Sequence, residues 1–552
     1  MNNKLRIGIL LDCNSIPAWS YLMLEKINTS SCSEIVLIVK NKSAFAKKKS
    51  LLRRIIVNRN SILYYLFTKI ENKFFKITPD AFEIKDIRTM LSIDTIEVNP
   101  SKTKYRDIIN EIDLKEIEKY NIDIFIRMGF RILSGDILKI AKYGIWSFHH
   151  GDNKVNKGGP AGFWEVFESW PETGVILQIL TEDLDSGILL HKSYSLTDTI
   201  SPTRNKNNYY WKALSFIPSK IEELYNLGEE MFFKKVDELN IHPQFYSNRL
   251  YTIPTNKEMF LFGFNLFFRY FQNKINAIFY FKQWILLFKL SSHNSISTSF
   301  FQFKKIVPPK DRIWADPHVL RRNNKYYIFI EELVHSLKKG HISLIVMDDK
   351  GSYTEPVKVL ERDYHLSYPF IIEDNGELYM VPETAENNTI ELYKCTLFPS
   401  KWELKIILID NIIAVDSTII FKDGKYWLFA NVVRNKGASS LDELFLFSSE
   451  KLVSNNWISH PQNPIVSDVK QSRPAGNFFI YKDNLYRPSQ NCSKRYGYGM
   501  RINQVIELTE TNYQEKVVDS IFPNWERNLQ STHTISSVNN LTVIDALIKR
   551  RK

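Results

Sequence analysis

The sequence predicts an α/β Rossmann-like domain followed by an all-β five-bladed propeller. In the first half, short apolar runs alternate with helical patterns, which is typical of a mostly parallel sheet with helices on both faces. The second half contains a weak internal repeat of about fifty residues, the length range of a propeller blade. At 552 residues the chain is also too long for one hydrophobic core. We therefore expect an α/β domain at residues 1–210, a helical linker at 211–300 and a propeller at 301–552.

The first half has the order of elements that a parallel sheet requires. Apolar runs predict strands at residues 5–11, 34–39, 95–98, 122–127 and 144–149. Amphipathic patterns predict helices at residues 17–27, 105–120, 134–141 and 219–239, and a basic helical insertion at 42–85. A ligand is expected beyond the carboxyl ends of the strands. Gly8 stands alone after the first apolar residues, without a GxGxxG turn, which argues against an ordinary dinucleotide site.

Charge and composition indicate a folded protein of a reducing compartment. The formal net charge is +12, with basic clusters at residues 47–59 and 549–552, which either attract phosphate groups or form solvated faces. The four cysteines are scattered and show no metal or disulfide spacing. Residues 1–11 are predicted to form a strand rather than a signal peptide. We expect a cytoplasmic protein that can also lie peripherally on the inner membrane face. We do not expect it to bind nucleic acid.

Residues 259–290 carry Phe, Leu and Ile at roughly helical spacing. Arg269, Lys274 and Lys282 interrupt the apolar run, so it is too short to span a bilayer. Two interpretations stay open: the helix packs between the two domains, or it lies on a membrane surface.

The second half repeats a short motif before each pair of aromatic strands. The four motifs are Trp314-Ala-Asp-Pro, Ser367-Tyr-Pro, Asp416-Ser-Thr and Ser472-Arg-Pro-Ala-Gly. Residues 533–545 supply a fifth strand pair, which we expect to close the ring with a strand from before Asp311.

The densest group of polar and glycine residues lies between residues 144 and 187. It contains Gly144-Ile-Trp-Ser-Phe-His-His-Gly-Asp, Lys157-Gly-Gly-Pro-Ala-Gly-Phe-Trp-Glu, Thr173-Gly-Val and Leu184-Asp-Ser-Gly. These motifs resemble the catalytic domain shared by methionyl-tRNA formyltransferase, glycinamide ribonucleotide formyltransferase and the sugar N-formyltransferases. The resemblance covers about residues 4–200, and the order and spacing of four motifs make it specific.

The resemblance implies a formyl transfer with 10-formyltetrahydrofolate as donor. By position His149 and Asp185 match the catalytic pair, and Ser147 replaces the family's asparagine. A protonated imidazole can stabilise the tetrahedral oxyanion, and a carboxylate can hold the imidazole charged. A lost oxyanion donor costs about 100- to 1000-fold in rate, so Ser147 is the main departure. The loop residues expected to contact the pterin ring are Met128, Gly129 and Phe130.

The expected substrate loop differs from the family pattern. His150 stands where the family has proline, Gly151-Asp152 replaces its usual segment, and Lys157-Gly158 takes the place of an Arg-Gly pair. We expect His150, Asp152, Lys157 and Gly158 to contact the substrate. The doublet His149-His150 beside Asp152 has no third ligand at a defined spacing, so no metal is expected.

Residues 305–548 resemble the N-terminal domain of plant glucosamine inositolphosphorylceramide transferases and, more distantly, the propellers of glycoside hydrolase family 43. In such propellers the inner strands direct polar residues into a central funnel. The candidates here are Asp316, Glu331, Glu383, Asp416 and Arg473, with Asn431, Arg487 and Gln490 behind them. Paired carboxylates are what glycoside hydrolysis requires. Sugar binding, a transferase role and purely structural use remain open alternatives.

The two resemblances together predict a protein of surface-glycan biosynthesis. The first hypothesis is an enzyme that transfers a formyl or related group from the folate donor to an amino sugar, nucleotide- or lipid-linked, held with help from the propeller. The alternative is a glycosyltransferase or a glycan-binding protein, with its site in the propeller and a degenerate formyltransferase domain. An anionic membrane surface is a further expected partner.

Overall fold

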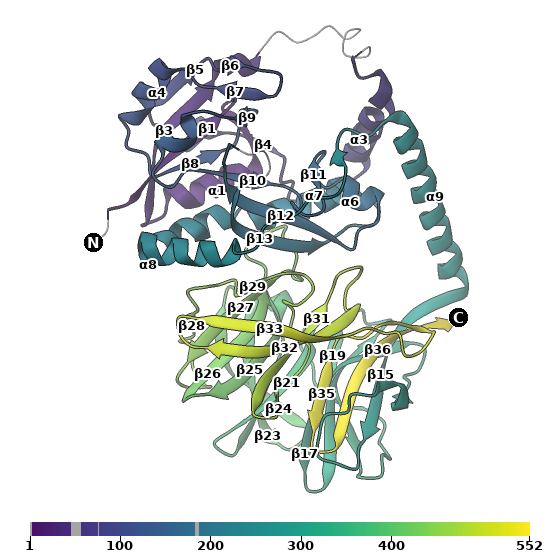
Figure 1. The fold of residues 1–552 in the computed structure, drawn as a ribbon. Helices are drawn as coiled ribbons and strands as arrows, with labels where there is room; N and C mark the ends of the chain where they lie inside the picture. The colour runs from purple at the N-terminus through teal and green to yellow at the C-terminus, as the bar shows by residue number, and fades with distance from the viewer. Residues whose placement is uncertain (1–2, 46–56, 76, 183–186) are drawn as a thin grey trace. The chain divides into compact units, whose positions relative to one another are not determined.

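The computed structural model describes residues 3–45, 57–75, 77–182 and 187–552. They form two compact units, each described here by itself (Figure 1). The first unit contains Met1–Ser193, Thr197–Phe267 and Arg434–Ser439. The second unit contains Tyr194–Leu196, Phe268–Val433 and Ser440–Lys552.

A mostly parallel sheet forms the centre of the first unit, as the sequence predicts. Its strand order in the described part of the chain is β13-β12-β10-β8-β1-β3-β5. Neighbours from β10 to β5 run parallel, whereas β12 runs antiparallel to β10. The strands are β1 (Leu5–Leu11), β3 (Ser33–Asn41), β5 (Thr95–Val98), β8 (Ile124–Arg127), β10 (Ile145–His149), β12 (Glu172–Ile179) and β13 (Ile188–Leu196).

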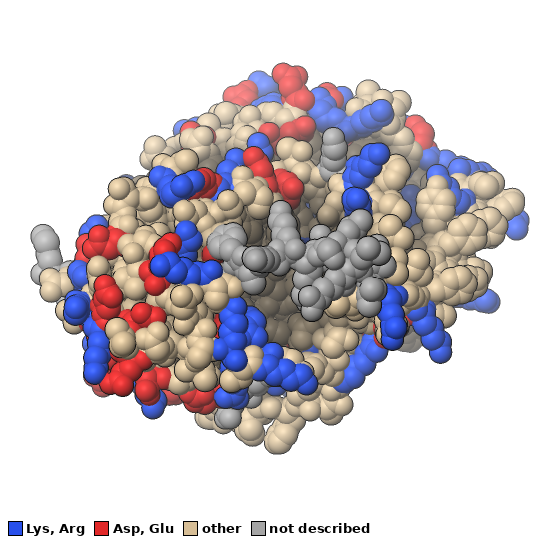
Figure 2. Space-filling model, turned by 90° about the horizontal axis from the view of Figure 1, so that it is seen from above, with Lys and Arg blue, Asp and Glu red and all other residues tan. Residues whose placement is uncertain are grey.

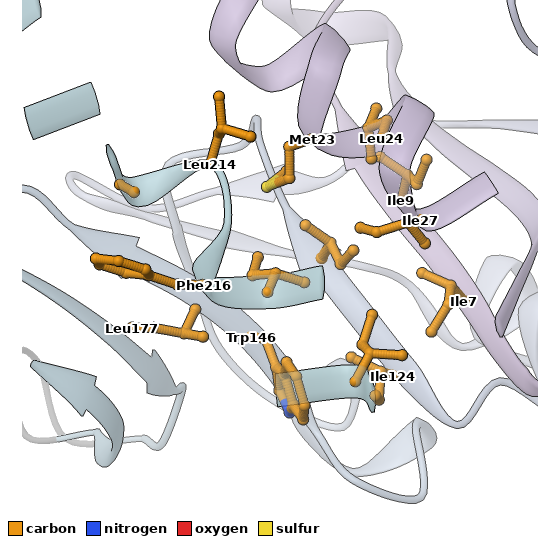
Figure 3. Close-up of a cluster of buried hydrophobic side chains, with 14 of the residues drawn as sticks. Ile7, Ile9, Met23, Leu24, Ile27, Ile124, Trp146, Leu177, Leu214 and Phe216 are labelled. Carbon is orange, nitrogen blue, oxygen red and sulfur yellow. The ribbon is translucent and has the colours of Figure 1, made fainter. Parts of the chain in front are cut away.

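Helices cover the sheet because alternate strand residues point to opposite faces. Ile7 and Ile9 of β1 join the core on one side, whereas Leu10 joins the core on the other. Figure 3 shows part of the first core, where Trp146 and Ile124 lie near side chains of the covering helices. The helices that pack on the sheet are α1 (Ala18–Asn28), α4 (Glu111–Glu118), α5 (Ile137–Ile140), α7 (Pro202–Ala213) and α8 (Phe216–Leu239). The other helices, α3 (Ile62–Phe74), α6 (Trp164–Phe167) and α9 (Asn256–Phe279), contribute to a separate apolar cluster.

Small strands and turns complete the first unit. The short pairs are β2 (Ser15–Pro17) with β4 (Ile84–Asp86), β6 (Ser101–Lys102) and β9 (Ile132–Leu133) with β7 (Arg106–Ile108), and β11 (Lys157–Gly158) with β14 (Leu250–Tyr251). The 3-10 helices of the two units are η1 (Lys42–Phe45), η2 (Arg59–Ser61), η3 (Ile87–Thr89), η4 (Phe300–Gln302) and η5 (Ala385–Asn387).

Two predicted helical stretches differ in extent from the structure. Residues 105–120 begin with β7, because the Asn110 side chain accepts a hydrogen bond from the Asp113 N–H and starts α4 only there. Residues 42–85 are helical over α3 and end at β4, while residues 46–56 and 76 lie outside the described residues. The helix predicted at residues 219–239 is confirmed, since it lies within α8, and the apolar side chains of α7 and α8 pack into the core of the sheet.

The predicted helix at 259–290 is a helix only to Phe279. The following residues form β15 (Tyr280–Leu290), which pairs along its length with β36 (Leu541–Arg551). Ile285 and Leu287 enter one core and Leu286 and Phe288 another, which is the period of two of a buried strand. A run of Phe, Leu and Ile satisfies both periods, so its pattern does not separate helix from strand.

The second unit consists of five antiparallel sheets in the described part of the chain. Four of them follow one another along the chain. The first sheet contains β17 (Arg312–Arg322), β18 (Lys325–Val334), β19 (Gly340–Met347) and β20 (Val357–Leu360), and the second contains β21 (Ser367–Asp374), β22 (Glu377–Glu383), β23 (Thr389–Leu397) and β24 (Lys401–Asp410). The third contains β25 (Ala414–Lys422), β26 (Lys425–Val432), β27 (Glu443–Ser449), β28 (Ile458–Ser459) and β29 (Val466–Ser467). The fourth contains β30 (Phe479–Tyr481), β31 (Asn484–Asn491), β32 (Gly499–Leu508) and β33 (Tyr513–Ile521).

The fifth sheet combines strands from both ends of the second unit. It contains β15 and β16 (Lys304–Ile306) together with β34 (Leu529–Ser531), β35 (Ile535–Val538) and β36. The strand pair expected at residues 533–545 therefore shares a sheet with β15, which precedes Asp311 in the chain. The prediction of a propeller-type, all-β second half is confirmed at the level of these five sheets.

Candidate functional site

A repeated irregularity positions the candidate residues of the second unit. The first strands of three sheets shift register at Ala315/His318, Ser367/Phe370 and Val415/Thr418. Each shift holds one residue at positive φ, namely Asp316 at 51°, Tyr368 at 43° and Asp416 at 52°. A bulge of this kind re-aims a side chain. The three residues therefore occupy equivalent places in their sheets.

Arg473 joins carboxylates from two different sheets. Its Nη2 donates to Asp416 Oδ1 (3.2 Å) and to Glu383 Oε2 (3.4 Å), and its Nε donates to Asp416 Oδ2. Gln490 Nε2 donates to the same Asp416 oxygen (2.6 Å). Asp416 is 1% and Arg473 is 7% exposed, so this network lies in the interior. Four of the predicted residues thus meet in one hydrogen-bonded group.

A second group surrounds Asp316. The Thr534 hydroxyl donates to Asp316 Oδ1 (2.7 Å), and the Asp316 N–H donates to Asp545 Oδ2 (3.1 Å). His533 Nδ1 lies 2.6 Å from Asp545 Oδ2 and 3.9 Å from Asp316 Oδ1. Burial opposes a charge on His533, but Asp545 and Asp316 outweigh it and raise its pKa to about 9. His533 is therefore the cation that balances this group.

Asp316, His533 and Asp545 offer ligand atoms within 4.8 Å of one another and could hold a metal ion. In this arrangement the Asp545 carboxylate accepts the backbone N–H groups of His533 (2.9 Å) and Thr534 (3.1 Å). The charged imidazole offsets part of the negative charge of the two carboxylates. The three residues form a candidate metal site that sequence reasoning, which expected no metal, did not identify.

Glu331 completes the acidic side of the site. It lies opposite Ala315 in the β17–β18 pair, and its Oε1 lies 3.3 Å from His365 Nε2. Glu331 raises the pKa of His365. However, His365 Nδ1 accepts the Gly340 N–H (3.0 Å), a contact that only the neutral ring can make. We refer to Asp316, Glu331, Glu383, Asp416 and Asp545 as the acidic cluster.

The acidic cluster contains more carboxyl groups than cations. Burial raises the pKa of Asp316 to about 7, and Asp416, Glu331 and Asp545 add to this while His533 opposes it. Burial also raises the pKa of Glu383 well above its usual range, with Asp416 adding to the effect. Burial therefore favours the protonated form of two of these carboxyl groups, Asp316 and Glu383. A protonated carboxyl and a neighbouring carboxylate can act as general acid and base.

Tyr496 connects both groups to solvent. The Arg473 guanidinium lies 4.9 Å from the centre of its ring, and the His533 ring lies 5.2 Å away, edge-on. The side chain is 39% exposed and belongs to the loop between β31 and β32. Trp284 stacks on the other side of His533, with ring centres 4.1 Å apart. An accessible aromatic ring beside buried polar groups is typical of a small-molecule site.

Two residues expected behind the site have other contacts. Arg487 pairs with Glu515 (2.7 Å) and donates to the Gln471 carbonyl (2.7 Å). The Asn431 amide donates to the Ser440 carbonyl (3.2 Å). Sequence reasoning missed Tyr496, and it treated His533 and Asp545 only as strand residues. The sequence feature that could have identified His533 as a site residue was its position at the start of the fifth repeat.

In the first unit, Ser147 and His149 lie on the same face of β10, next to the end of β8. Arg127 Nη1 donates to Ser147 Oγ (3.0 Å), and its Nη2 donates to the carbonyls of Phe130 (3.2 Å) and Arg131 (3.0 Å). The Ser147 hydroxyl donates to the Phe148 carbonyl (3.4 Å). His149 Nε2 lies 2.8 Å from the Asn156 carbonyl oxygen. The third predicted member, Asp185, lies outside the described residues.

The predicted folate residues hold the loop after β8 against β1. A Cβ on Gly129 would lie 2.4 Å from the Asp12 backbone nitrogen, so the two segments approach closely. The Phe130 N–H donates to Asp12 Oδ1 (2.9 Å), and the Phe130 side chain is buried in a core. Met128 packs, partly buried, against the other core.

The predicted substrate residues also have structural contacts. The His150 ring stacks on Tyr210 with centres 3.8 Å apart, and burial lowers its pKa. Asp152 pairs with Lys192 (2.7 Å). The Lys157 N–H donates to Tyr246 Oη (3.2 Å). Gly158 has a φ of 106°, and a Cβ there would lie 2.0 Å from the Tyr251 carbonyl oxygen, so β11 can approach β14 only with glycine.

Glu165 is a buried acid that sequence reasoning did not assign. It is 1% exposed, and burial raises its pKa to about 7. One carboxyl oxygen accepts from Asn156 Nδ2 (3.0 Å), while Oε2 has no hydrogen-bond partner among the described residues. Asn156 therefore joins His149 and Glu165. The sequence feature that could have identified Glu165 as a site residue was its place in the Gly-Phe-Trp-Glu motif.

Comparisons with known proteins agree with the two resemblances. Residues 303–536 match the family described as glucosamine inositolphosphorylceramide transferase 1, N-terminal. The chain is 34% identical over 208 residues to glucosamine inositolphosphorylceramide transferase 1 of Oryza sativa subsp. japonica, a match that covers 37% of the chain and 28% of that protein. It is 30% identical over 194 residues to a methionyl-tRNA formyltransferase of Prochlorococcus marinus, covering 34% of the chain and 54% of that protein.

The chain thus spans about a quarter of the length of the first relative and about half of the second. Among solved structures, a family 117 glycoside hydrolase of Zobellia galactanivorans covers 49% of the chain and 90% of its own length, with 11% identity and a TM-score of 0.32.

Proposed function

We propose that this protein acts on a sugar of surface glycans and binds that sugar at the acidic cluster of the second unit. The observation that supports this is the meeting of Asp416, Glu383 and Arg473 in one buried network that reaches the accessible Tyr496 ring. The match of residues 303–536 to the family described as glucosamine inositolphosphorylceramide transferase 1, N-terminal, supports a sugar-related role of the second unit. In this proposal the five sheets are the blades of a closed propeller, with β15 and β36 joining its two ends.

The charge of the site favours an amino sugar. Arg473 and His533 do not balance the carboxyl groups, and burial raises the pKa values of Asp316 and Glu383, which favours a proton on each. A protonated sugar amine can replace such a proton and form charge-assisted hydrogen bonds. Tyr496 can stack on the sugar ring. The partner is then a nucleotide- or lipid-linked amino sugar, and the proposed location is the cytoplasm, at the inner face of a membrane.

The acid and base chemistry of glycosyl transfer can come from the same residues. A neutral carboxyl can protonate a leaving oxygen, and a neighbouring carboxylate can accept the proton of an attacking hydroxyl. Asp316 and Glu383 are the proposed proton donors, because their pKa values are raised, and Asp416, which pairs with Arg473, is the proposed proton acceptor. A glycan-binding role uses the same contacts without the proton transfers.

Titration calorimetry with methyl glucosaminide and methyl N-acetylglucosaminide tests this proposal. We expect the free amine to bind at least about tenfold more tightly, because a hydrogen bond to a charged group contributes about 1.5–3 kcal/mol. Asp416→Asn should abolish that preference. Glu515→Gln, which changes a buried carboxylate paired with Arg487 elsewhere in the unit, should leave it unchanged. Equal affinity for both sugars in a folded sample would exclude an amino-sugar site.

Formyl transfer in the first unit is the second candidate function, with 10-formyltetrahydrofolate as donor. The position of His149 at the carboxyl end of a parallel strand favours it, since ligands of such sheets bind there. In that reaction a protonated His149 would stabilise the oxyanion, and Asp185 would keep the His149 imidazole charged. Ser147 is a weak donor for this purpose, because Arg127 occupies its oxygen and its proton points to the Phe148 carbonyl.

Calorimetry with a stable 10-formyltetrahydrofolate analogue tests the second candidate. Binding by the native protein that His149→Ala weakens would support a folate pocket. Absence of binding in a folded sample would remove formyl transfer and leave the proposal for the second unit intact.

A further inference from the structure

Two helices of the chain combine an internal packing face with an exposed apolar face. Phe262 of α9 lies 5.4 Å from Phe67 of α3, measured between ring centres. Asn256 joins the same helices, since its Oδ1 accepts the Leu63 N–H (3.0 Å) and its Nδ2 donates to the Arg59 carbonyl (2.8 Å). These contacts use one side of each helix.

The other side of α9 exposes large apolar side chains. Phe260 is 70%, Phe267 66% and Ile278 64% exposed, and the spacing of these residues places them on one helix face. An exposed contiguous apolar surface of this kind marks an interaction site. Further exposed apolar residues are Leu261, Phe264, Phe268, Tyr270, Phe271, Ile275 and Phe279 on α9, and Leu66, Ile70 and Phe74 on α3.

The exposed charges of α3 and α9 are basic. Lys69 and Lys73 on α3 and Lys257 and Lys274 on α9 are exposed. The acids of these two helices are withdrawn: Glu71 is buried and accepts from the Ser201 hydroxyl, and Glu258 pairs with Arg249. Figure 2 shows one face of the molecule, on which acidic side chains gather at the lower left and the upper edge and basic side chains are spread over the whole face.

We propose that the exposed faces of α3 and α9 bind the surface of an anionic lipid bilayer. The aromatic side chains enter the boundary between headgroups and acyl chains, and the lysines lie at the level of the lipid phosphates. Among the described residues, none of the helices has both the length and the apolar character needed to cross a membrane. A second copy of the chain is a poorer occupant, because it would bring like charges together. This surface is independent of the proposed sugar site.

Vesicle sedimentation tests the proposal. The full-length protein should sediment with phosphatidylcholine vesicles that contain phosphatidylserine at low salt, and much less with pure phosphatidylcholine or at high salt. Phe260→Gln combined with Ile278→Gln should lower the partition coefficient at least about tenfold, since each buried large apolar side chain contributes a several-fold gain. Lys69→Gln and Lys73→Gln should each lower it about fivefold.

A matched control is available on the second unit. Phe421→Gln combined with Ile480→Gln removes side chains that are 57% and 74% exposed, from strands outside α3 and α9, and should leave sedimentation unchanged. Three results would overturn the proposal. These are no binding to anionic vesicles at low salt, equal effects of the two double variants, and a dimer in sedimentation velocity that Phe260→Gln with Ile278→Gln dissociates.

Discussion

The two candidate sites differ in how fully the fold itself uses their polar groups. In the first unit, Ser147 accepts from Arg127 and Asp152 pairs with Lys192, and of the buried acids among its described residues only Glu165, which sequence reasoning did not assign, has a carboxyl oxygen without a hydrogen-bond partner. In the second unit, the carboxyl groups outnumber the cations, and burial raises the pKa values of Asp316 and Glu383.

This difference distinguishes polar groups that the fold already pairs from buried carboxyl groups that a bound ligand could pair. A polar group that the fold satisfies contributes to stability with no ligand present. A buried surplus of one charge is costly, and natural proteins retain it mainly at functional sites. The acidic cluster is therefore the stronger candidate, and the expected effects of substitutions are larger there.

The largest expected effect comes from Arg473→Met. It leaves Asp416 and Glu383 buried without their cation, so we expect the second unit to lose about 3–5 kcal/mol in free energy of unfolding. Urea unfolding followed by tryptophan fluorescence and circular dichroism measures the loss. Arg321→Met removes a partly exposed pair with Asp349 and should cost less than about 1 kcal/mol. Similar losses in both variants would show that Arg473 does not hold the cluster together.

Gly476→Ala should have the next largest effect. Gly476 has a φ of 111°, and a Cβ there would lie 1.9 Å from the Ile535 carbonyl oxygen, so strain and overlap add to a cost of about 2–4 kcal/mol. Gly376 has a φ of 79° with nothing within 4 Å, and Gly376→Ala should cost only about 1–2 kcal/mol. Thermal unfolding of the two variants gives the comparison. An equal cost would mean that the backbone near Gly476 can move apart.

The charge on His533 predicts a pH dependence confined to the second unit. Its pKa is about 9 in the folded protein and about 6.5 in an unfolded chain, so the folded state binds more protons between these values. The stabilisation is complete below about pH 6.5 and is lost as the pH rises through 9, by about 3 kcal/mol. Urea midpoints across this range should fall more in the native protein than in His533→Gln, where Asp316 still titrates. A steep fall in the variant would assign the titration to another group.

The contacts of Asp316, Glu383, Asp416 and Arg473 follow from features that a sequence displays. Repeated motifs place these residues at comparable positions, and repetition of one sheet design brings comparable positions together. The contact of Arg127 with Ser147 could not be predicted in this way. It depends on the length and rotamer of one side chain across two strands, and neither leaves a periodic signal.

Other parts of the molecule show the same limit. The parallel sheet of the first unit follows from its alternating apolar runs, and β1, β3, β5, β8 and β10 lie close to their predicted ranges. The strand β15 was predicted as helix, because a continuous aromatic and aliphatic run satisfies both periods until a partner such as β36 is known. Pairing across the length of the chain decides such segments.

The smallest expected effect, from His150→Phe, tests whether His150 has a packing role alone in the first site. His150 is neutral because burial lowers its pKa, and its Nδ1 has no hydrogen-bond partner among the described residues. A phenyl ring can keep the stacking on Tyr210 without burying that nitrogen. We therefore expect the stability of the first unit to change by less than about 1 kcal/mol, measured by thermal unfolding.

His318→Phe in the second unit is the matched comparison. Burial also lowers the pKa of His318, to about 4, but its Nδ1 is hydrogen-bonded to Asn477 Oδ1 (2.9 Å). Phenylalanine there leaves the half-buried Asn477 acceptor without its donor, so a loss of about 1–3 kcal/mol is expected. If His150→Phe instead proves as costly as His318→Phe, or removes binding of a folate or sugar ligand, then His150 is a ligand contact. The site of the first unit would then contain, like the acidic cluster, buried polar groups that a ligand contacts.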